Sequence, residues 1–273
     1  VSLIMLEGFI ANLSSWLLSI SGGSLIMVAF YAGLFVALMT TLGALLAIFA
    51  NRMPGWGVDV SLSFAAGVMI VASFTSLILP AIESTGTFTP AGVGILLGVI
   101  LIYLIDRFIP HEHLVKGYEG PREFKERLRV VWLIVLAVII HNLPEGMAVG
   151  TSLVYDLERG LITAIAIGIQ DFPEGTVVSL PLATLQKKRL MPIVMGALSG
   201  VAEMVMVILG AFLFTVFHSL LPYGLGMAGG AMLYVTVKEM IPEIYKREEN
   251  ETLVTLGFFL GFYVMLFLDS MLG

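Results

Sequence analysis

The sequence predicts an all-α membrane protein, a polytopic helical bundle of eight transmembrane helices. Of the 273 residues, 58% are hydrophobic and only 12% are charged, whereas an ordinary soluble domain has about 25% charged residues. The apolar stretches run for about 20 residues, which is the length that a helix needs to cross the hydrocarbon core. Continuous runs such as "GILLGVILIYLI" also lack the alternation of polar and apolar residues that is typical of a β-barrel strand.

The apolar windows between charged, glycine and proline residues define the eight spans. They lie near 25–50, 59–82, 91–108, 129–154, 159–185, 191–217, 223–245 and 252–272. The N-terminal segment 1–23 is apolar but contains Glu7, Asn12 and several serines. It is therefore either a ninth span or a helix at the membrane surface. The whole chain, 1–273, is expected to form a single transmembrane transporter domain.

The basic residues are distributed almost entirely on one side of the predicted membrane. Thirteen of the 14 Lys and Arg residues lie in or beside the loops that follow spans 1, 3, 5 and 7, and only Arg159 lies on the other side. Because basic loops remain in the cytoplasm, we expect these loops inside a cell inner (plasma) membrane and the C-terminus outside. The longest loop, 109–128, is polar and rich in glycine and proline breaks, which indicates a solvated cytoplasmic loop.

Two related motifs interrupt spans 4 and 5. Residues 141–146 read "HNLPEG", and residues 170–175 read "QDFPEG". Because successive residues of a helix are 100° apart, the polar residues of each motif share one helix face. The proline of each motif cannot donate to the carbonyl four residues earlier, which permits a kink. Interrupted helices at mid-membrane depth mark binding sites in transporters.

The acidic residues of the two motifs require a counter-charge inside the membrane. A lone carboxylate at the bilayer centre costs at least about 2.5–3.5 kcal/mol, and no Lys or Arg lies near Glu145, Asp171 or Glu174 in the sequence. Either these groups are protonated or a cation lies among them. The same motifs supply one imidazole and two amides, from His141, Asn142 and Gln170. Such a mixed N/O set suits a divalent transition metal; interhelical hydrogen bonding and a proton relay are the competing interpretations.

Two other spans supply further candidate ligands. Glu203 in "SGVAEMVMV" of span 6 is another carboxylate among apolar residues, and the same cost argument assigns it a partner. Met69 in "FAAGVMIVAS" of span 2 is either a packing residue or a thioether ligand.

The two motifs, together with "SGVAE" and the C-terminal "FLDSMLG", resemble the ZIP family of divalent metal transporters, and within it the bacterial GufA-like branch. The resemblance covers nearly the whole chain from about residue 25. It implies an inverted repeat in which spans 1–3 and 6–8 are related around spans 4 and 5. It also implies a carrier that moves Zn²⁺ into the cytoplasm by elevator-like alternating access. Cd²⁺ is a further expected substrate, and Fe²⁺ and Mn²⁺ are additional candidates.

The resemblance further implies a binuclear metal site. The first metal position would be formed by His141, Glu145, Gln170, Asp171 and Glu174, with Met69 nearby. The second would be formed by Asn142, Asp171, Glu174 and Glu203. Asp171 and Glu174 would then bridge the two ions.

Residues toward both membrane faces also match the family pattern. An inner exit pathway would include Asp106, His111, Glu112, His113 and Glu239, with solvated surface positions as the alternative for the two histidines. The outer entrance would include Ser76 and Asp269. In place of the histidine of related sequences, Lys238 precedes Glu239, so we expect either a weaker exit site or a pairing of Lys238 with Glu239 that releases metal. His218 lies without acidic neighbours and is expected to be structural.

An enzyme of the same general chemistry is the alternative function. An intramembrane metal-dependent hydrolase would also use His and Glu, but the H-E-x-x-H pattern is absent from the sequence; a metal sensor or scaffold is a third option. We therefore expect no enzyme and no catalytic cofactor, with Zn²⁺ or Cd²⁺ bound as transported substrate. The expected partners are divalent metal ions and the lipid bilayer, and a homodimer is permitted. Nucleic acid is not expected, because no basic patch with aromatic residues occurs.

Overall fold

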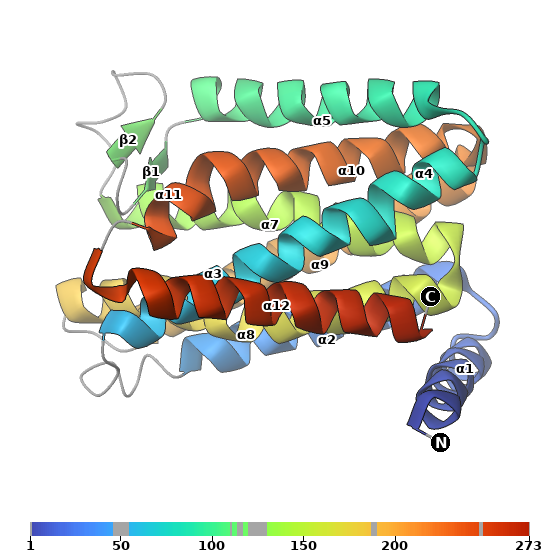
Figure 1. The fold of residues 1–273 in the computed structure, drawn as a ribbon, viewed down its shortest axis with the longest axis horizontal. Coiled ribbons are helices and arrows are strands. Elements are labelled where there is room, and N and C mark those ends of the chain that lie inside the picture. Colours follow the sequence, from blue (N-terminus) through green and yellow to red (C-terminus); the bar gives the residue numbers. More distant parts are fainter. Residues whose placement is uncertain are drawn as a thin grey trace.

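The computed structural model describes residues 2–45, 55–109, 111–113, 117–119, 130–186, 190–245 and 248–272. These residues are almost entirely helical (Figure 1). The helices are α1 (Ser2–Ile20), α2 (Leu25–Leu45), α3 (Gly55–Ala72), α4 (Leu79–Glu83), α5 (Phe88–Phe108), α7 (Val130–Tyr155), α8 (Leu157–Gln186), α9 (Leu190–Val216), α10 (Leu221–Val235), α11 (Ile241–Ile244) and α12 (Glu251–Leu272). Shorter segments are the π-helical η2 (Ser73–Ile78) and η4 (Thr236–Met240) and the 3-10 helices η3 (His218–Leu220) and η5 (Glu248–Asn250).

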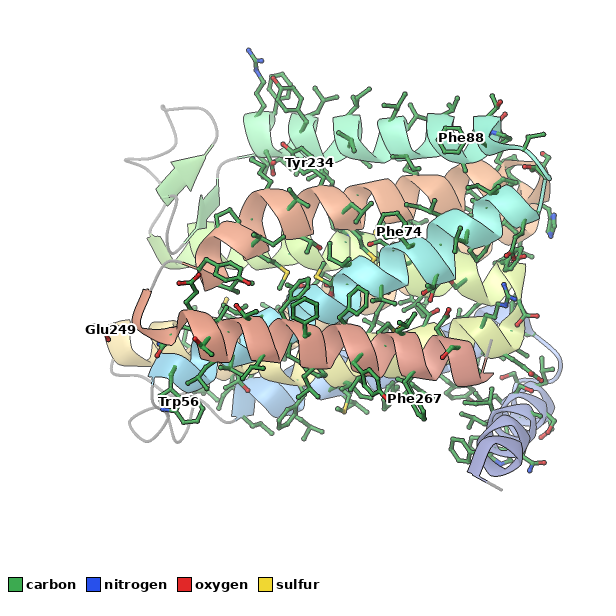
Figure 2. All side chains as sticks on the ribbon, in the orientation of Figure 1. Trp56, Phe74, Phe88, Tyr234, Glu249 and Phe267 are labelled. Carbon is green, nitrogen blue, oxygen red and sulfur yellow. The ribbon has the colours of Figure 1, made fainter. Side chains whose placement is uncertain are left out.

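The chain is a multi-pass helical membrane protein. Within the described residues, six helical stretches are long and apolar enough to cross a membrane: Leu25–Leu45, Leu62–Glu83, Phe88–Phe108, Leu190–Val216, His218–Met240 and Glu251–Ser270. Large apolar side chains cover their outward faces, as Figure 2 shows along α5 and α12. Trp56 is half exposed near the start of α3, at one end of the bundle, where tryptophan is favoured at the membrane surface.

The helices fall into two groups by their contacts. In the first, α2 packs along α8 and α9, and α7 packs along α8 and α9. In the second, α3 packs along α12 and α5 packs along α10. We call α2, α7, α8 and α9 the site bundle. The flanking bundle consists of α3, α5, α10 and α12 with the short segments η2, α4, η4 and α11.

Glycine permits the close packing within the flanking bundle. A Cβ placed on Gly98 of α5 would lie 2.8 Å from the backbone nitrogen of Ala231, and one placed on Gly230 of α10 would lie 2.7 Å from the Cα of Ile95. No side chain fits at these distances, so the two backbones touch directly. Small residues have this role in membrane helix pairs, where close van der Waals contact drives association.

A π-helical turn and a proline interrupt one helix in each half of the chain. In the first half η2 precedes Pro80, and in the second half η4 precedes Pro242. Proline has no N–H to donate to the carbonyl four residues earlier, which for Pro80 is the carbonyl of Ser76. The Ser152 hydroxyl of α7 donates to that carbonyl at 3.1 Å. The interruption in η2 therefore creates a hydrogen bond between the two bundles.

The loop predicted at 109–128 contains regular structure that the sequence did not indicate. Strands β1 (His111–His113) and β2 (Gly117–Glu119) pair antiparallel, with His111 opposite Glu119. β1 also contacts α7, so this hairpin packs against the bundle. The all-α class holds for the rest of the described residues. This hairpin was not predicted, because a strand pair as short as three residues leaves no hydrophobic period to detect.

Candidate metal centre

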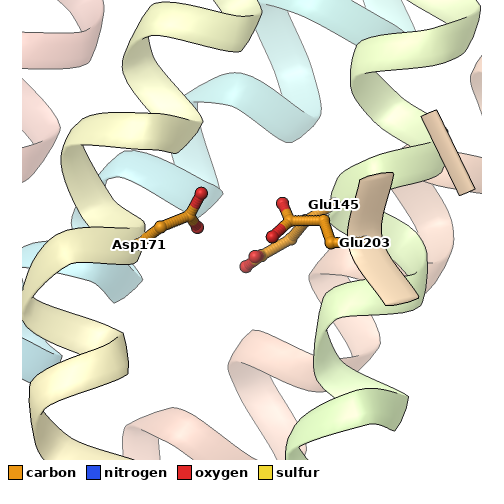
Figure 3. Close-up of side chains that lie close together, drawn as sticks. All are labelled: Glu145, Asp171 and Glu203. Carbon is orange, nitrogen blue, oxygen red and sulfur yellow. The ribbon is translucent and has the colours of Figure 1, made fainter. Parts of the chain in front are cut away.

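Three carboxylates from three helices meet in the interior of the site bundle. Glu145 of α7, Asp171 of α8 and Glu203 of α9 each offer an oxygen, and these oxygens lie within 4.8 Å of one another. Figure 3 shows Asp171 projecting from its helix toward Glu145 and Glu203, which lie side by side. The three side chains are at most 1% exposed. Like charges so close and so deeply buried are unfavourable unless protons or a cation compensate them.

Two amide side chains hold two of these carboxylates in place. The Gln170 amide donates to Glu145 Oε1 at 2.8 Å, and the Asn142 amide donates to Glu203 Oε2 at 3.3 Å. All four residues are buried. The carboxylates are therefore oriented by hydrogen bonds before any ion enters, which reduces the ordering cost of binding.

The amide oxygens left by this arrangement fit a cation. Asn142 Oδ1 and Gln170 Oε1 are buried and have no hydrogen-bond partner within the described part of the chain. Such orphaned acceptors are costly in an apolar interior. Apart from Arg159 at its start, α8 has no Lys or Arg, and α7 and α9 have none. Carboxylate and amide oxygens are ligands that a divalent ion accepts.

The other predicted metal ligands are placed less completely. His141 lies in α7 and Glu174 lies in α8, but their side chains are outside the described part of the structure. Met69 of α3 is fully buried, and the Thr236 hydroxyl of η4 lies 3.7 Å from its sulfur. Met69 therefore belongs to the flanking bundle, whereas the three clustered carboxylates belong to the site bundle.

The predicted exit residues lie at the end of the bundle that carries the β hairpin. Asp106 of α5 and Glu239 of η4 are 4% and 5% exposed. The Lys238 ammonium donates to Asp106 Oδ2 at 2.6 Å, a partner that the sequence did not indicate. His111, Glu112 and His113 form β1, and their side chains are outside the described residues.

The predicted entrance residues lie at the opposite end and contact each other. The Ser76 hydroxyl donates to Asp269 Oδ1 at 3.4 Å, which joins η2 to α12. Nearby, Arg159 at the start of α8 forms an ion pair with Glu83 of α4 at 3.3 Å. His218 lies in the exposed segment η3.

Comparison with known proteins identifies the family. The family described as ZIP Zinc transporter matches residues 112–269, which is more than half of the chain. The chain belongs to the ZIP zinc transporter family.

Several ZIP relatives resemble the chain over most of its length. Zinc transporter ZIPB of Bordetella bronchiseptica is 40% identical over 243 residues, which cover 86% of this chain and 78% of that protein. Zinc transporter GufA of Myxococcus xanthus is 37% identical over 89% of this chain and 98% of that protein. Human zinc transporter ZIP11 is 31% identical over 93% of this chain. Because these relatives are named as zinc transporters, the predicted membership of the bacterial GufA-like branch of the ZIP family is confirmed, and an enzyme, including the hydrolase alternative, is not supported.

Sequence reasoning did not single out two residues on the helices that carry the three clustered carboxylates. Ser199 lies one turn before Glu203 on α9, and its buried hydroxyl has no hydrogen-bond partner among the described residues. Gly146 follows Glu145 and lies against the carbonyl oxygen of Glu203. The four-residue spacing of Ser199 and Glu203 could have indicated the first. The contact of Gly146 with the backbone of α9 could not be foreseen, because it depends on which helices pack together.

Proposed function

We propose that this ZIP protein moves divalent metal ions, Zn²⁺ foremost and Cd²⁺ as well, across the membrane into the cytoplasm. The observation that supports this most strongly is the buried cluster of Glu145, Asp171 and Glu203, whose oxygens lie within 4.8 Å of one another. Three carboxylates attract a divalent ion and replace its water shell, while the amide oxygens complete the coordination. The names of the relatives, all zinc transporters, support Zn²⁺ as the substrate.

The site is proposed to hold two ions. The two amide–carboxylate pairs support this division, because Gln170 with Glu145 and Asn142 with Glu203 fall into the two ligand sets that the family resemblance implies. Asp171 is within reach of both carboxylates and is proposed to bridge. His141 and Glu174 are proposed as further ligands because they belong to the same motifs on α7 and α8.

The protein is proposed to have eight transmembrane helices, with α7 and α8 added to the six apolar stretches. At about 1.5 Å per residue, these two helices of 26 and 30 residues exceed the hydrocarbon thickness of about 30 Å. An inverted repeat is supported by the matching contacts: α3 with α12 corresponds to α10 with α5, and α2 with α8 corresponds to α9 with α7. The π-helical turns before Pro80 and Pro242 occupy corresponding positions.

The end that carries the β hairpin is proposed to face the cytoplasm of an inner (plasma) membrane. The ends of α5 and η4 with Arg107 and Lys238 lie there, and both termini lie at the opposite end (Figure 1). Basic residues on the cytoplasmic side support this orientation, which leaves the C-terminus outside.

Alternating access is proposed to occur by elevator-like movement of the site bundle against the flanking bundle. Among the described glycines, those that lie against the backbone of another helix do so within one bundle, as Gly150 of α7 does against Val207 and Ala211 of α9. Direct backbone contact locks each bundle internally. No described glycine makes such a backbone contact across the boundary between the bundles, so the side chains there can exchange partners more easily.

The outer end is proposed to be closed in the present conformation. Two polar contacts join the bundles there: the Arg159–Glu83 ion pair at 3.3 Å and the hydrogen bond from Ser152 to the carbonyl of Ser76 at 3.1 Å. Ser76 is only 4% exposed, as expected for an entrance residue behind a closed outer end.

Zinc flux of the purified chain in liposomes containing a zinc-sensitive dye tests the proposed transport. We expect dye signal that depends on external Zn²⁺ and on the protein, and that saturates with Zn²⁺ concentration. Liposomes with a folded Asp171→Asn variant are the control. Wild-type protein that is folded but gives no more flux than empty liposomes would refute the carrier.

Labelling of an introduced cysteine tests closure of the outer end. Because the chain has no cysteine, Ser76→Cys can be modified selectively by a membrane-impermeant thiol reagent added outside. Arg159→Ala should raise the labelling rate by up to about fivefold, since an exposed ion pair contributes at most about 1 kcal/mol. The charge exchange Glu83→Arg with Arg159→Glu should restore the original rate. An unchanged rate in Arg159→Ala would show that this pair does not hold the outer end closed.

A further inference from the structure

The inner end of the flanking bundle contains an ammonium group at a buried carboxylate. Asp106 of α5 is 4% exposed, and Lys238 Nζ lies 2.6 Å from its Oδ2. The same Nζ lies 5.5 Å from the ring centroid of Tyr234, over its face. A carboxylate and an aromatic face both attract cations. The ammonium thus occupies a position that is built to hold positive charge.

Lys238 lies on a segment that reaches from the buried core to the inner end. It belongs to η4, together with Thr236, whose hydroxyl contacts the Met69 sulfur, and Glu239, a second buried carboxylate. Helical turns with π geometry often occur at functional sites. Lys238 is 29% exposed and Asp106 only 4%, so the lysine side chain approaches the carboxylate from the more accessible side.

We propose that the Lys238 ammonium is a tethered cation that occupies Asp106 in place of a divalent ion, so that metal leaving toward the cytoplasm is not retained there. This inference rests on the proposed transport function. A buried carboxylate such as Asp106 attracts a divalent ion more strongly than a monovalent one, since attraction scales with charge. The ammonium neutralises Asp106 and repels an approaching metal ion. Its flexible four-carbon stem lets it move aside and return as an ion passes.

A purely structural ion pair is the competing explanation. Removal of one partner of a buried pair destabilises a protein, because the other charge is left uncompensated. That explanation predicts a loss of stability when Lys238 is replaced and no change in the number of bound metal ions. If Lys238 is a tethered cation, its replacement allows one additional metal ion to bind. The number of bound metal ions therefore separates the two explanations.

Zinc stoichiometry of purified, full-length Lys238→Met, compared with wild type and Lys238→Arg, tests the inference. Equilibrium dialysis at one fixed free Zn²⁺ concentration, followed by elemental analysis, should give about one more zinc ion per chain in Lys238→Met. The same variant should transport zinc at least threefold more slowly in liposomes. Lys238→Arg keeps the positive charge and should bind as many ions as wild type.

A third variant shows where the additional ion binds. Adding Asp106→Asn to Lys238→Met should abolish the extra zinc. If Lys238→Met does not fold, Lys238→Gln makes the same comparison, because its amide still donates a hydrogen bond to Asp106. Equal stoichiometry in wild type and the folded neutral variant, or a gain in Lys238→Arg as well, would overturn the inference. Absence of zinc flux in the wild type would instead refute the proposed function.

Discussion

Glu145→Gln and Asp171→Asn should each lower zinc affinity and zinc flux at least tenfold. Each substitution keeps the size of the side chain but removes one negative charge from a cluster whose oxygens lie within 4.8 Å of one another. At an effective dielectric constant of about 20, one unit charge about 4 Å from another contributes about 4 kcal/mol. Because about 1.4 kcal/mol corresponds to a factor of ten, the expected loss exceeds tenfold even if most of this energy is offset.

Isothermal titration with Zn²⁺ and liposome flux measure the two effects. His218→Ala is the matched control. Histidine is a residue type that often binds zinc, but His218 lies exposed in η3, so this variant should leave affinity and flux unchanged. Glu145→Gln and Asp171→Asn should both remain folded, because Gln and Asn fill the same volume as Glu and Asp and relieve the repulsion among the carboxylates. Equal losses of zinc affinity in all three variants, or no loss in Glu145→Gln and Asp171→Asn, would contradict the assignment of the site to this cluster.

Gly146→Ala should lower both the melting temperature and the zinc affinity. A Cβ at this position would overlap the carbonyl oxygen of Glu203 and lie 2.8 Å from the Cβ of Met206. Because backbone cannot yield as a flexible side chain does, α7 and α9 must move apart. Overpacking of this kind typically costs about 1–3 kcal/mol. The separation also moves Glu145 away from Glu203, so we expect zinc affinity to fall about tenfold.

Gly8→Ala provides a control with the same chemical change. Gly8 lies in α1 with open space where a Cβ would be placed. Alanine is favoured over glycine inside a helix by about 0.8–1 kcal/mol, so this variant should keep or slightly raise the melting temperature. Thermal unfolding in detergent and zinc titration make the comparison. If Gly146→Ala behaved as Gly8→Ala does, the contact between α7 and α9 would not set the geometry of the site.

The class and family of this protein follow from local features of the sequence. Apolar runs as long as a membrane crossing predict the helices, because in lipid every backbone group must be bonded within the segment. The two motifs "HNLPEG" and "QDFPEG" indicated the ZIP family, which the comparisons confirm. The polar residues of each motif could be placed on one helix face from spacing alone. The distances among residues of different helices could not be obtained in that way.

Helix pairing decided which of these residues meet. Asn142 contacts Glu203 across 61 residues of sequence, and Lys238 contacts Asp106 across 132. From the sequence, either a weaker exit site or a pairing of Lys238 with Glu239 was expected, and Asp106 was not anticipated as a partner of Lys238. Hydropathy reports only whether a side chain prefers lipid or water, so it does not predict which neighbour a lysine or an amide side chain contacts.

The tertiary structure also determined how closely the helices approach. Gly146 appears in the sequence as part of a motif, yet its contact with the backbone of α9 brings Glu145 and Glu203 together. The sequence by itself determined a helical ZIP transporter with acidic residues inside the membrane. Only the packed bundle decided which three carboxylates share one space, because that depends on contacts between backbones that lie far apart along the chain.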